Sequence, residues 1–194
     1  WPDPYRWLIA DDTLYPDWLP PSEMPFGTNA DTLSARVNPR GLLDALRTAL
    51  EQTGVTIMEG AEIRFGEHGK PALADGTAID ADHVILAAGW ETFGLVDSGF
   101  AEPTGSGVKG QAALLRPSGP VDRNQPIIYD DGIYVIAHDS GLVAIGSTSE
   151  NDFEEPSETD ARLDSVIGRA RSLCPALADA EIMERWAGIR PKAS

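Results

Sequence analysis

The chain has 194 residues, 42% of them hydrophobic and 24% charged, which is typical of a globular protein with one domain or pieces of two. Its net charge of −16 argues against binding nucleic acid or an anionic membrane surface through electrostatics. No apolar run is long enough for a transmembrane helix, so no membrane insertion is expected. The single cysteine, Cys174, excludes an internal disulfide and predicts a reducing, cytoplasmic location.

The N-terminal stretch, residues 1–37, is rich in Pro and Trp, with one short strand predicted at residues 7–10 and a loop at residues 18–25. A helix then begins at Asn38 and Pro39, since Asn is a good cap and Pro is favoured at the first helical position. Apolar residues follow at helical spacing before Gly54 ends the helix: Leu42, Leu43, Leu46, Ala49 and Leu50.

The next segment predicts three strands. Two short ones are expected at residues 55–58 and 61–65, followed by a turn at Asp75-Gly76. The apolar run from Val84 to Gly89 has the composition of a buried strand that ends in glycine.

From residue 108 onward the pattern predicts a meander of antiparallel strands. Residues 111–115 form one strand, and residues 127–129 and 133–137 flank Asp130-Asp131-Gly132, which is a hairpin signal. A further strand is expected at residues 142–146.

The C-terminal part predicts an acidic loop, a helix and a last strand. Carboxylates at residues 150–158 are expected on a solvated loop, and a helix is expected at about 158–173 with Ser157 as a candidate cap. Its apolar stripe consists of Leu163, Val166, Ile167 and Ala170. The last strand, from residue 181, leads to Arg190. The order of elements predicts an α+β fold with a mixed, largely antiparallel sheet and flanking helices.

Most familiar motifs are absent or lie in the wrong context. Residues 105–110 match G-x-G-x-x-G, but a strand follows them instead of the helix that a dinucleotide site needs. The histidines lack metal-ligand spacing, and no nucleophile motif is present, so neither a metal site nor a catalytic side chain is predicted.

Two polar residues are the candidates for a binding site. Arg190 lies between Ile189 and Pro191, where we expect a strand to end, and its planar fork matches a carboxylate. Strand alternation turns Tyr134 away from the side of Ile133 and Val135, so its hydroxyl is available to the same anion. The alternatives are an ordinary ion pair for Arg190 and ring packing for Tyr134.

Six blocks, in order, resemble the D-amino-acid oxidase and glycine oxidase family of FAD-dependent oxidoreductases. They look like the family patterns V-x-P-x-x-L, G-V…G-x-x-V, V-V-x-A-x-G-x-W, P-x-R-G-Q, Y-x-x-P…G…G-x-T-x-E and W-x-G-x-R-P. In this chain they lie at residues 37–46, 54–63, 84–90, 108–111, 134–150 and 186–191.

The resemblance implies a function for particular residues. Tyr134 and Arg190 would hold the carboxylate of a small amino acid or amine substrate. The backbone of Ile63 would lie near the adenine end of FAD, and Ala87, Ala88 and Gly89 would approach the cofactor. The flavin itself would take a hydride from the substrate to give the imine, with O₂ as acceptor and no catalytic side chain required.

The resemblance also implies boundaries and departures. Residues 38–95 would be part of an FAD-binding domain and 96–185 the substrate domain, into which residues 1–37 lead, and 186–194 would return to the FAD domain. The family's N-terminal G-x-G-x-x-G unit and its segment after R-P are missing, so the chain is expected to be the middle of a longer oxidase, without bound FAD or activity by itself. Lys109, Ala137 and His138 stand where the family has Arg, Pro and Arg.

Two alternatives remain open from the sequence. One is a non-catalytic interaction or scaffold domain that keeps the fold. The other is an FAD-linked dehydrogenase that reduces a quinone. The substrate's identity and chirality and the oligomeric state are not predicted.

Overall fold

The computed structural model describes residues 5–10, 15–65, 70–96 and 102–194. The chain forms two compact units. Unit 1 comprises Trp1–Val37 and Gly107–Arg190, and unit 2 comprises Asn38–Ser106 and Pro191–Ser194. The chain therefore passes from unit 1 to unit 2, returns to unit 1 and enters unit 2 again at its last residues. Each unit is described by itself.

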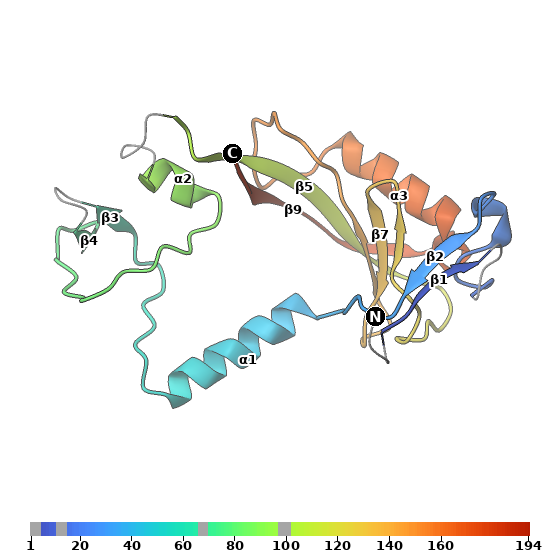
Figure 1. Cartoon of the computed structure of the whole chain (residues 1–194), viewed down its shortest axis with the longest axis horizontal. Helices are drawn as coiled ribbons and strands as arrows, with labels where there is room; N and C mark the ends of the chain where they lie inside the picture. The colour runs from blue at the N-terminus through green and yellow to red at the C-terminus, as the bar shows by residue number, and fades with distance from the viewer. Residues whose placement is uncertain (1–4, 11–14, 66–69, 97–101) are drawn as a thin grey trace. The chain divides into compact units, whose positions relative to one another are not determined.

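Unit 1 is built on a five-stranded sheet with the order β6-β7-β8-β5-β9 (Figure 1). Its strands are β5 (Gly105–Arg116), β6 (Ile128–Asp130), β7 (Ile133–Ala137), β8 (Val143–Gly146) and β9 (Glu181–Ala193). The pairs β6–β7, β7–β8 and β5–β8 are antiparallel. A separate antiparallel pair joins β1 (Trp7–Ala10) and β2 (Thr28–Asp31), which confirms the short strand predicted at residues 7–10.

The hairpin between β6 and β7 forms where the sequence predicts it. Asp130 pairs with Ile133, which leaves Asp131 and Gly132 as a two-residue loop. Both loop residues have positive φ, at 43° and 83°, as a type I′ turn requires. Asp and Gly tolerate this conformation better than other residues do, so the turn sequence fixes the register of the hairpin.

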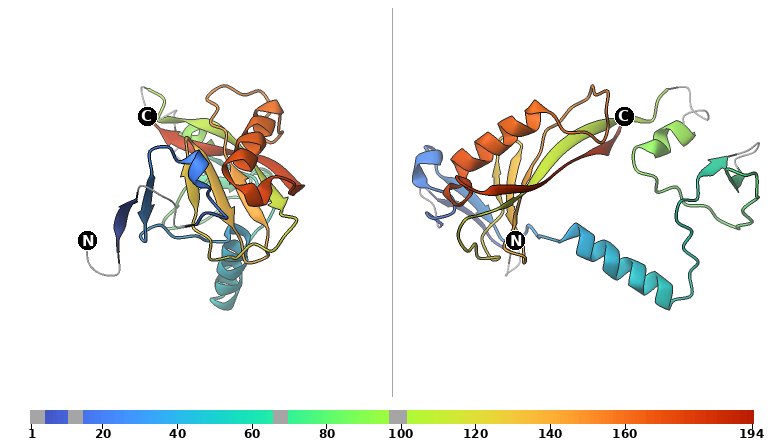
Figure 2. Two further views of the ribbon diagram at one scale, coloured as in Figure 1. Left: turned by 90° about the vertical axis from the view of Figure 1, so that its right-hand side faces the viewer. Right: turned by 180° about the vertical axis from the view of Figure 1, so that it is seen from behind.

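The core of unit 1 lies between one face of the sheet and α3 (Ala161–Leu173) (Figure 2). On β5, the residues from Lys109 to Leu115 alternate between buried and half-buried side chains, because successive side chains point to opposite faces of a sheet. The predicted stripe of α3 is confirmed, since Leu163, Val166, Ile167 and Ala170 are all buried.

Trp18 completes this core from the N-terminal stretch. Its side chain is only 1% exposed and packs in the same cluster as α3, and its indole Nε1 donates to the carbonyl of Pro126 at 2.9 Å. The segment predicted as a loop is a turn followed by the short 3₁₀ helix η1 (Pro21–Glu23), and it contributes one of the largest buried side chains.

The N-terminus of α3 differs from the prediction. The helix begins at Ala161, with Asp160 as the cap accepting from the Arg162 backbone N–H at 2.9 Å, and not at residue 158 with Ser157 as the cap. The reason is a tertiary contact, since the Asp160 backbone N–H also donates to the side chain of Gln111 on β5. A second 3₁₀ helix, η4 (Pro175–Leu177), follows α3 and buries Leu177.

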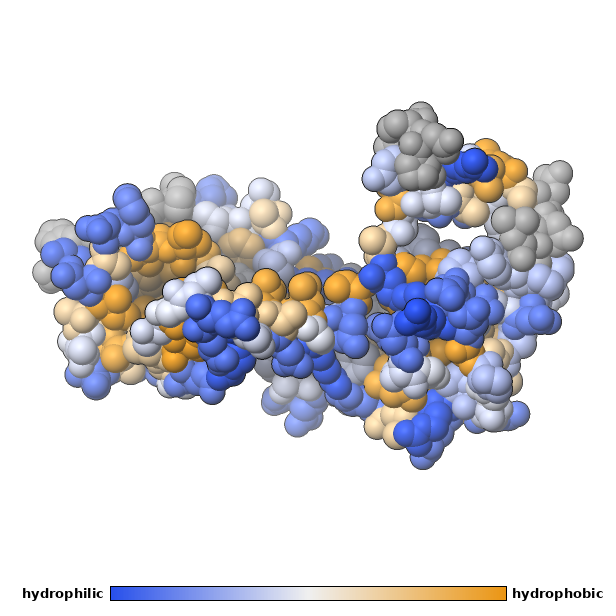
Figure 3. All heavy atoms as spheres, turned by 90° about the horizontal axis from the view of Figure 1, so that it is seen from below, coloured by the Kyte–Doolittle hydropathy of each residue, from blue (hydrophilic) through white to orange (hydrophobic). Residues whose placement is uncertain are grey.

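Unit 2 contains α1 (Pro39–Gln52), which begins as predicted. Asn38 caps the helix by accepting from the Gly41 N–H at 3.1 Å, and Pro39 takes the first helical position. The helix has no buried residue, and Figure 3 shows apolar residues exposed over it. The exposed side chains are the leucines of the predicted stripe: Leu42, Leu43, Leu46 and Leu50.

Two strands predicted in unit 2 are not formed. Residues 55–58 and 84–88 have no regular secondary structure, and Ile85 is 89% exposed. A buried strand needs partners on both sides, and no strand of the described residues pairs with either segment. The strands that do form are β3 (Ile63–Phe65) and β4 (Pro71–Leu73), which pair antiparallel.

The described part of unit 2 also contains the short helix α2 (Glu91–Val96). The predicted turn at Asp75-Gly76 follows β4. Helices and largely antiparallel sheets together confirm the predicted α+β class. No helix in the described part of the chain is long and apolar enough to cross a membrane.

Candidate functional site

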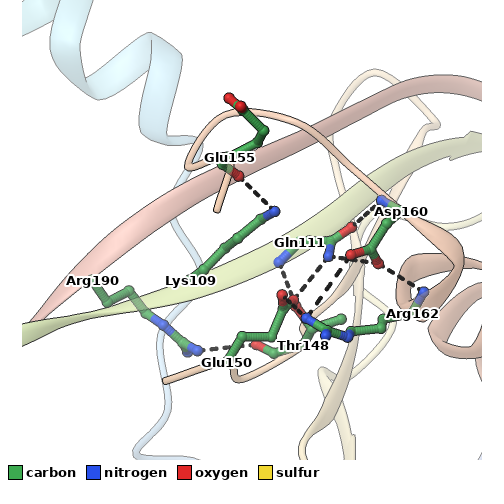
Figure 4. Close-up of polar contacts among 8 residues, drawn as sticks. All are labelled: Lys109, Gln111, Thr148, Glu150, Glu155, Asp160, Arg162 and Arg190. Carbon is green, nitrogen blue, oxygen red and sulfur yellow. Dashed lines mark hydrogen bonds and ion pairs between the residues drawn. The ribbon is translucent and has the colours of Figure 1, made fainter. Parts of the chain in front are cut away.

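Arg190 lies on β9 and reaches across the neighbouring strand. Its NH2 group donates to the backbone carbonyl of Thr148 at 3.0 Å, as drawn in Figure 4. On the way it passes over Gly110 of β5, where an added Cβ would lie 3.3 Å from the same NH2 group. The guanidinium is therefore on the face of β5 toward which a Gly110 side chain would point. The predicted end of the strand at Arg190 is wrong, because β9 continues to Ala193.

Tyr134 lies on the same face of the sheet as Arg190. It is directly opposite Gly146 on β8, which is directly opposite Ala112 on β5. Ala112 is two residues from Gly110, so side chains at both positions point to one face. Because directly opposed residues of antiparallel strands also share a face, the phenol and the guanidinium both lie on the face opposite α3.

Only small residues lie between these two side chains in the sheet. A Cβ added to Gly146 would come within 2.8 Å of the Cβ of Ala112, so the register leaves no room for a larger residue there. Gly110 completes a floor of three small residues, which we call the small-residue floor: Gly110, Ala112 and Gly146. Arg190 and Tyr134 are exposed at its two sides.

This face of the sheet carries two hydrogen-bond donors suited to an anion, one at each side of the small-residue floor. A guanidinium has five N–H donors, and Arg190 uses one NH2 group on Thr148. No salt bridge involves Arg190 among the described residues, so the alternative of an ordinary ion pair finds no partner there. A carboxylate is the anion that matches a planar fork and a phenol hydroxyl.

Tyr134 also makes the ring contact that the alternative interpretation expects. Its ring centroid lies 4.7 Å from that of Tyr129, the directly opposite residue on β6, at an angle of 44°. Both rings remain largely exposed, at 46% and 62%. Ring packing therefore holds one side of Tyr134 without burying it.

A polar network centred on the buried residues Gln111 and Glu150 lies on the other face of β5, beneath the N-terminus of α3 (Figure 4). The Gln111 amide Nε2 donates to Glu150 at 2.8 Å and to Asp160 at 3.0 Å, and its Oε1 accepts from the Asp160 N–H at 2.8 Å. The Thr148 hydroxyl and the Arg162 Nη1 also donate to Glu150. These five residues are the Gln111–Glu150 network.

Sequence reasoning missed this network and placed Glu150 on a solvated loop. Glu150 is 7% exposed, and its backbone forms a bridge with Lys109. Lys109 is also buried, and its Nζ donates to the carbonyl of Glu155 at 2.7 Å. The sequence carried one signal for this network. Lys109 and Gln111 are two residues apart on one strand, so their side chains point to the same face. Polar side chains on a buried face need hydrogen-bond partners.

Two carboxyls of the network have pKa values below their usual range. Burial alone raises the pKa of Glu150, but hydrogen bonds from Thr148, Gln111 and Arg162 and the charge of Arg162 outweigh it, so the pKa is lowered. For Asp160, the hydrogen bond from Gln111 contributes most to lowering the pKa. Both carboxyls are therefore ionised at neutral pH and act as acceptors only.

The residues predicted to bind a cofactor are in unit 2. Ile63 begins β3 and pairs with Leu73. Ala87, Ala88 and Gly89 are exposed and precede α2, and the Ala88 N–H donates to the Thr92 hydroxyl at 3.1 Å. Among the described residues no hydrogen bond joins Ile63 to the alanine-glycine segment.

The alanine-glycine segment leaves its backbone open to a ligand. Gly89 has a φ of 59° and no atom within 4 Å of an added Cβ, so a ligand can approach the backbone closely. Among the described residues no three His, Cys, Asp or Glu side chains gather as a metal ion would require.

Comparison with known proteins decides the family. The model of the family described as FAD dependent oxidoreductase matches residues 4–194. The chain belongs to this family. A glycine oxidase from Pseudomonas aeruginosa is 33% identical over 160 residues, which are 79% of this chain and 43% of that protein. A bifunctional protein ThiO/ThiG from Synechocystis sp. is 32% identical over 166 residues, which are 80% of this chain and 24% of that protein.

A solved structure shares the fold of this family member. The crystal structure of iminodiacetate oxidase from Chelativorans sp. has a TM-score of 0.80 and 24% identity, and the match covers 99% of this chain and 53% of that one. The chain thus spans between about a quarter and about a half of the length of the proteins it matches.

Proposed function

We propose that the chain is part of an FAD-dependent oxidase that converts a small amino acid, or a related amine that carries a carboxylate, to the imine. The observation that carries the proposal is that Arg190 and Tyr134 share the open face of one sheet, at the two sides of the small-residue floor. The names of two similar proteins, glycine oxidase and iminodiacetate oxidase, both denote an amine with a carboxylate. That chemistry supports the substrate class.

In this proposal unit 1 is the substrate domain, and unit 2 is part of the FAD-binding domain. Arg190 binds the substrate carboxylate through its free donors, and the Tyr134 hydroxyl donates to the same carboxylate. Fixing the carboxylate at two points orients the Cα–H bond of the substrate, and orientation of this kind lowers the barrier by converting a bimolecular encounter to a unimolecular one.

The cofactor would be held partly by unit 2. Ile63 would lie near the adenine end, and Ala87, Ala88 and Gly89 would let the cofactor approach the backbone. When bound, FAD supplies the acceptor for the hydride of the substrate, and O₂ then receives the electrons. No side chain of this chain is assigned as a catalytic acid or base.

The test uses the full-length protein that contains this chain. Arg190→Ala should weaken the binding of a carboxylate substrate by about 2–5 kcal/mol, the range for breaking a desolvated charge pair. The effect is expected mainly in KM, because Arg190 binds the carboxylate in the ground state as well as in the transition state. Tyr129→Phe is the matched control, since it keeps the ring that packs on Tyr134.

The two assays together separate the outcomes. Steady-state kinetics with glycine and other small amino acids measure the effect of Arg190→Ala, and an unchanged KM for every carboxylate substrate would remove the role given to Arg190. Production of H₂O₂ tests the acceptor. If the protein reduces a quinone-like dye during turnover and makes no H₂O₂, it is a dehydrogenase and not an oxidase.

A further inference from the structure

We propose that Thr148 is a positioning residue for Arg190, and that the Gln111–Glu150 network fixes Thr148 from the other face of the sheet. This inference rests on the proposed function, because it concerns how the guanidinium is presented to a carboxylate. Thr148 connects the two faces, since its carbonyl accepts from Arg190 while its hydroxyl joins the network.

Three hydrogen bonds hold the Thr148 residue in place. Its N–H donates to the Gln111 carbonyl at 3.2 Å. Its hydroxyl accepts from the Gln111 N–H at 2.8 Å and donates to Glu150 Oε1. Beyond the carbonyl that receives Arg190, the Glu150 N–H donates to the Lys109 carbonyl at 2.9 Å, so the backbone is held on both sides of that carbonyl.

The network behind Thr148 is held at its centre by two buried side chains, Gln111 and Glu150, whose polar atoms are satisfied. Gln111 is fully buried, and each polar atom of its side chain amide has a partner in Glu150 or Asp160. A buried polar network of this kind resists rearrangement, because moving one member leaves others without partners. Asp160 ties it to the first turn of α3, so the position of Thr148 follows that of the helix.

Gly110 provides the space in which Arg190 meets Thr148. An added Cβ would lie 3.3 Å from the Arg190 NH2 group and 3.3 Å from the Thr148 carbonyl oxygen. A methyl group there would press on both the guanidinium and the Thr148 carbonyl. Gly110 therefore offers a test of this contact that leaves the Thr148 hydroxyl in place.

The physical benefit is pre-organisation. An exposed arginine has many rotamers, and restricting them on binding costs side-chain entropy. A guanidinium that is already held by one backbone carbonyl has lost part of this freedom before the ligand arrives. The remaining donors then meet the carboxylate at a lower entropic cost.

The experiment measures acetate binding to the full-length protein by isothermal titration calorimetry. Thr148→Val removes the hydroxyl at nearly constant volume and is expected to weaken acetate binding about tenfold, a loss of about 1.4 kcal/mol. Thr148→Ser keeps a hydroxyl and should bind acetate as the wild type does. Gly110→Ala should weaken acetate binding, as Thr148→Val does. Thermal unfolding of each variant is measured alongside.

Leu163→Ala controls for stability. It removes a core side chain of α3 that is fully buried and does not contact Arg190, so it should lower the unfolding temperature and leave the acetate affinity unchanged. A purely structural role for Thr148 predicts that Thr148→Val also lowers stability without changing affinity, and that result would overturn the inference.

The Arg190→Ala variant distinguishes failure of this inference from failure of the proposed function. If Arg190→Ala leaves acetate binding unchanged, the proposed function fails. A crystal structure of Thr148→Val then decides the positioning role by itself. A guanidinium that has left the carbonyl of residue 148 supports the role, and one that keeps this hydrogen bond contradicts it.

Discussion

At the scale of single residues, burial and hydrogen bonding give neighbouring polar groups different roles. Arg190 is exposed and available to a ligand, whereas Glu150 is enclosed by donors. The Glu150 carboxylate is thus a structural acceptor. Its ion pair with Arg162 joins a side chain that is 6% exposed to one that is 59% exposed, so the pair lies at the edge of the network.

The lowered pKa of Glu150 predicts how stability depends on pH. Its folded-state pKa lies below the unfolded value of about 4.3, so its contribution is complete above that value and is lost as the pH falls through the folded-state pKa. The free energy of unfolding should therefore fall more steeply from pH 5 to pH 3 in the wild type than in Glu150→Gln. Chemical denaturation at several pH values measures both slopes.

The control for this prediction is Glu158→Gln, which removes the same charge from an exposed position of the acidic loop. It should keep the steep pH dependence of the wild type. Parallel stability curves for the wild type and Glu150→Gln would show that Glu150 titrates alike in the folded and unfolded protein.

At the scale of elements, helix caps and tight turns could be predicted where they depend only on residues that are neighbours in the sequence. Asn38 and Pro39 predicted the start of α1, and Asp131-Gly132 predicted the hairpin turn. The start of α3 was predicted three residues too early, because Asp160 is selected as the cap by Gln111, which is 49 residues away in the sequence. Such a contact has no local signal.

Two glycines predict opposite effects of the same substitution. Gly132 lies in the hairpin with a φ of 83°, and Gly168 lies in the interior of α3. At both positions an added Cβ would have no atom within 4 Å. Gly132→Ala should destabilise the protein by about 1–2 kcal/mol, the cost of a left-handed conformation for a residue with a Cβ. Gly168→Ala should stabilise it by about 0.5–1 kcal/mol through helix propensity.

Denaturant unfolding of the two glycine variants checks both signs. Because neither position gains a clash, the difference between them isolates the backbone conformation. A stabilising Gly132→Ala would mean that the turn adopts another conformation in solution, and a destabilising Gly168→Ala would contradict the helical backbone at that position.

At the scale of the whole molecule, the two units differ in how much of their apolar surface is buried. Unit 1 has a continuous core under α3. In unit 2, α1 buries none of its leucines, and Val84 and Ile85 are 47% and 89% exposed. The fold class followed from sequence pattern and resemblance, and strand alternation predicted that Tyr134 points away from the side of Val135. The sequence did not predict that the strand at residues 84–89 fails to form, since pairing depends on partner strands.

This difference bears on cofactor binding. Among the described residues the only G-x-G-x-x-G lies inside β5. A strand and not a helix continues from this motif, so it offers no helix N-terminus to bind the phosphates of FAD. We therefore predict that the 194-residue chain, purified by itself, binds no FAD, whereas the full-length protein does. Absorbance spectra of the two proteins, prepared in parallel, measure this, and a flavin band in the isolated chain would contradict the prediction.

The central claim is that Arg190 and Tyr134 bind one carboxylate, and a double-mutant cycle tests it most directly. Acetate affinity is measured for the full-length wild type, Arg190→Ala, Tyr134→Phe and the double variant. If both side chains bind the same carboxylate, each single variant weakens binding and the two losses are not additive, with a coupling of at least about 0.5 kcal/mol. Affinities that are unchanged in the single variants, or losses that add without coupling, would contradict a shared site.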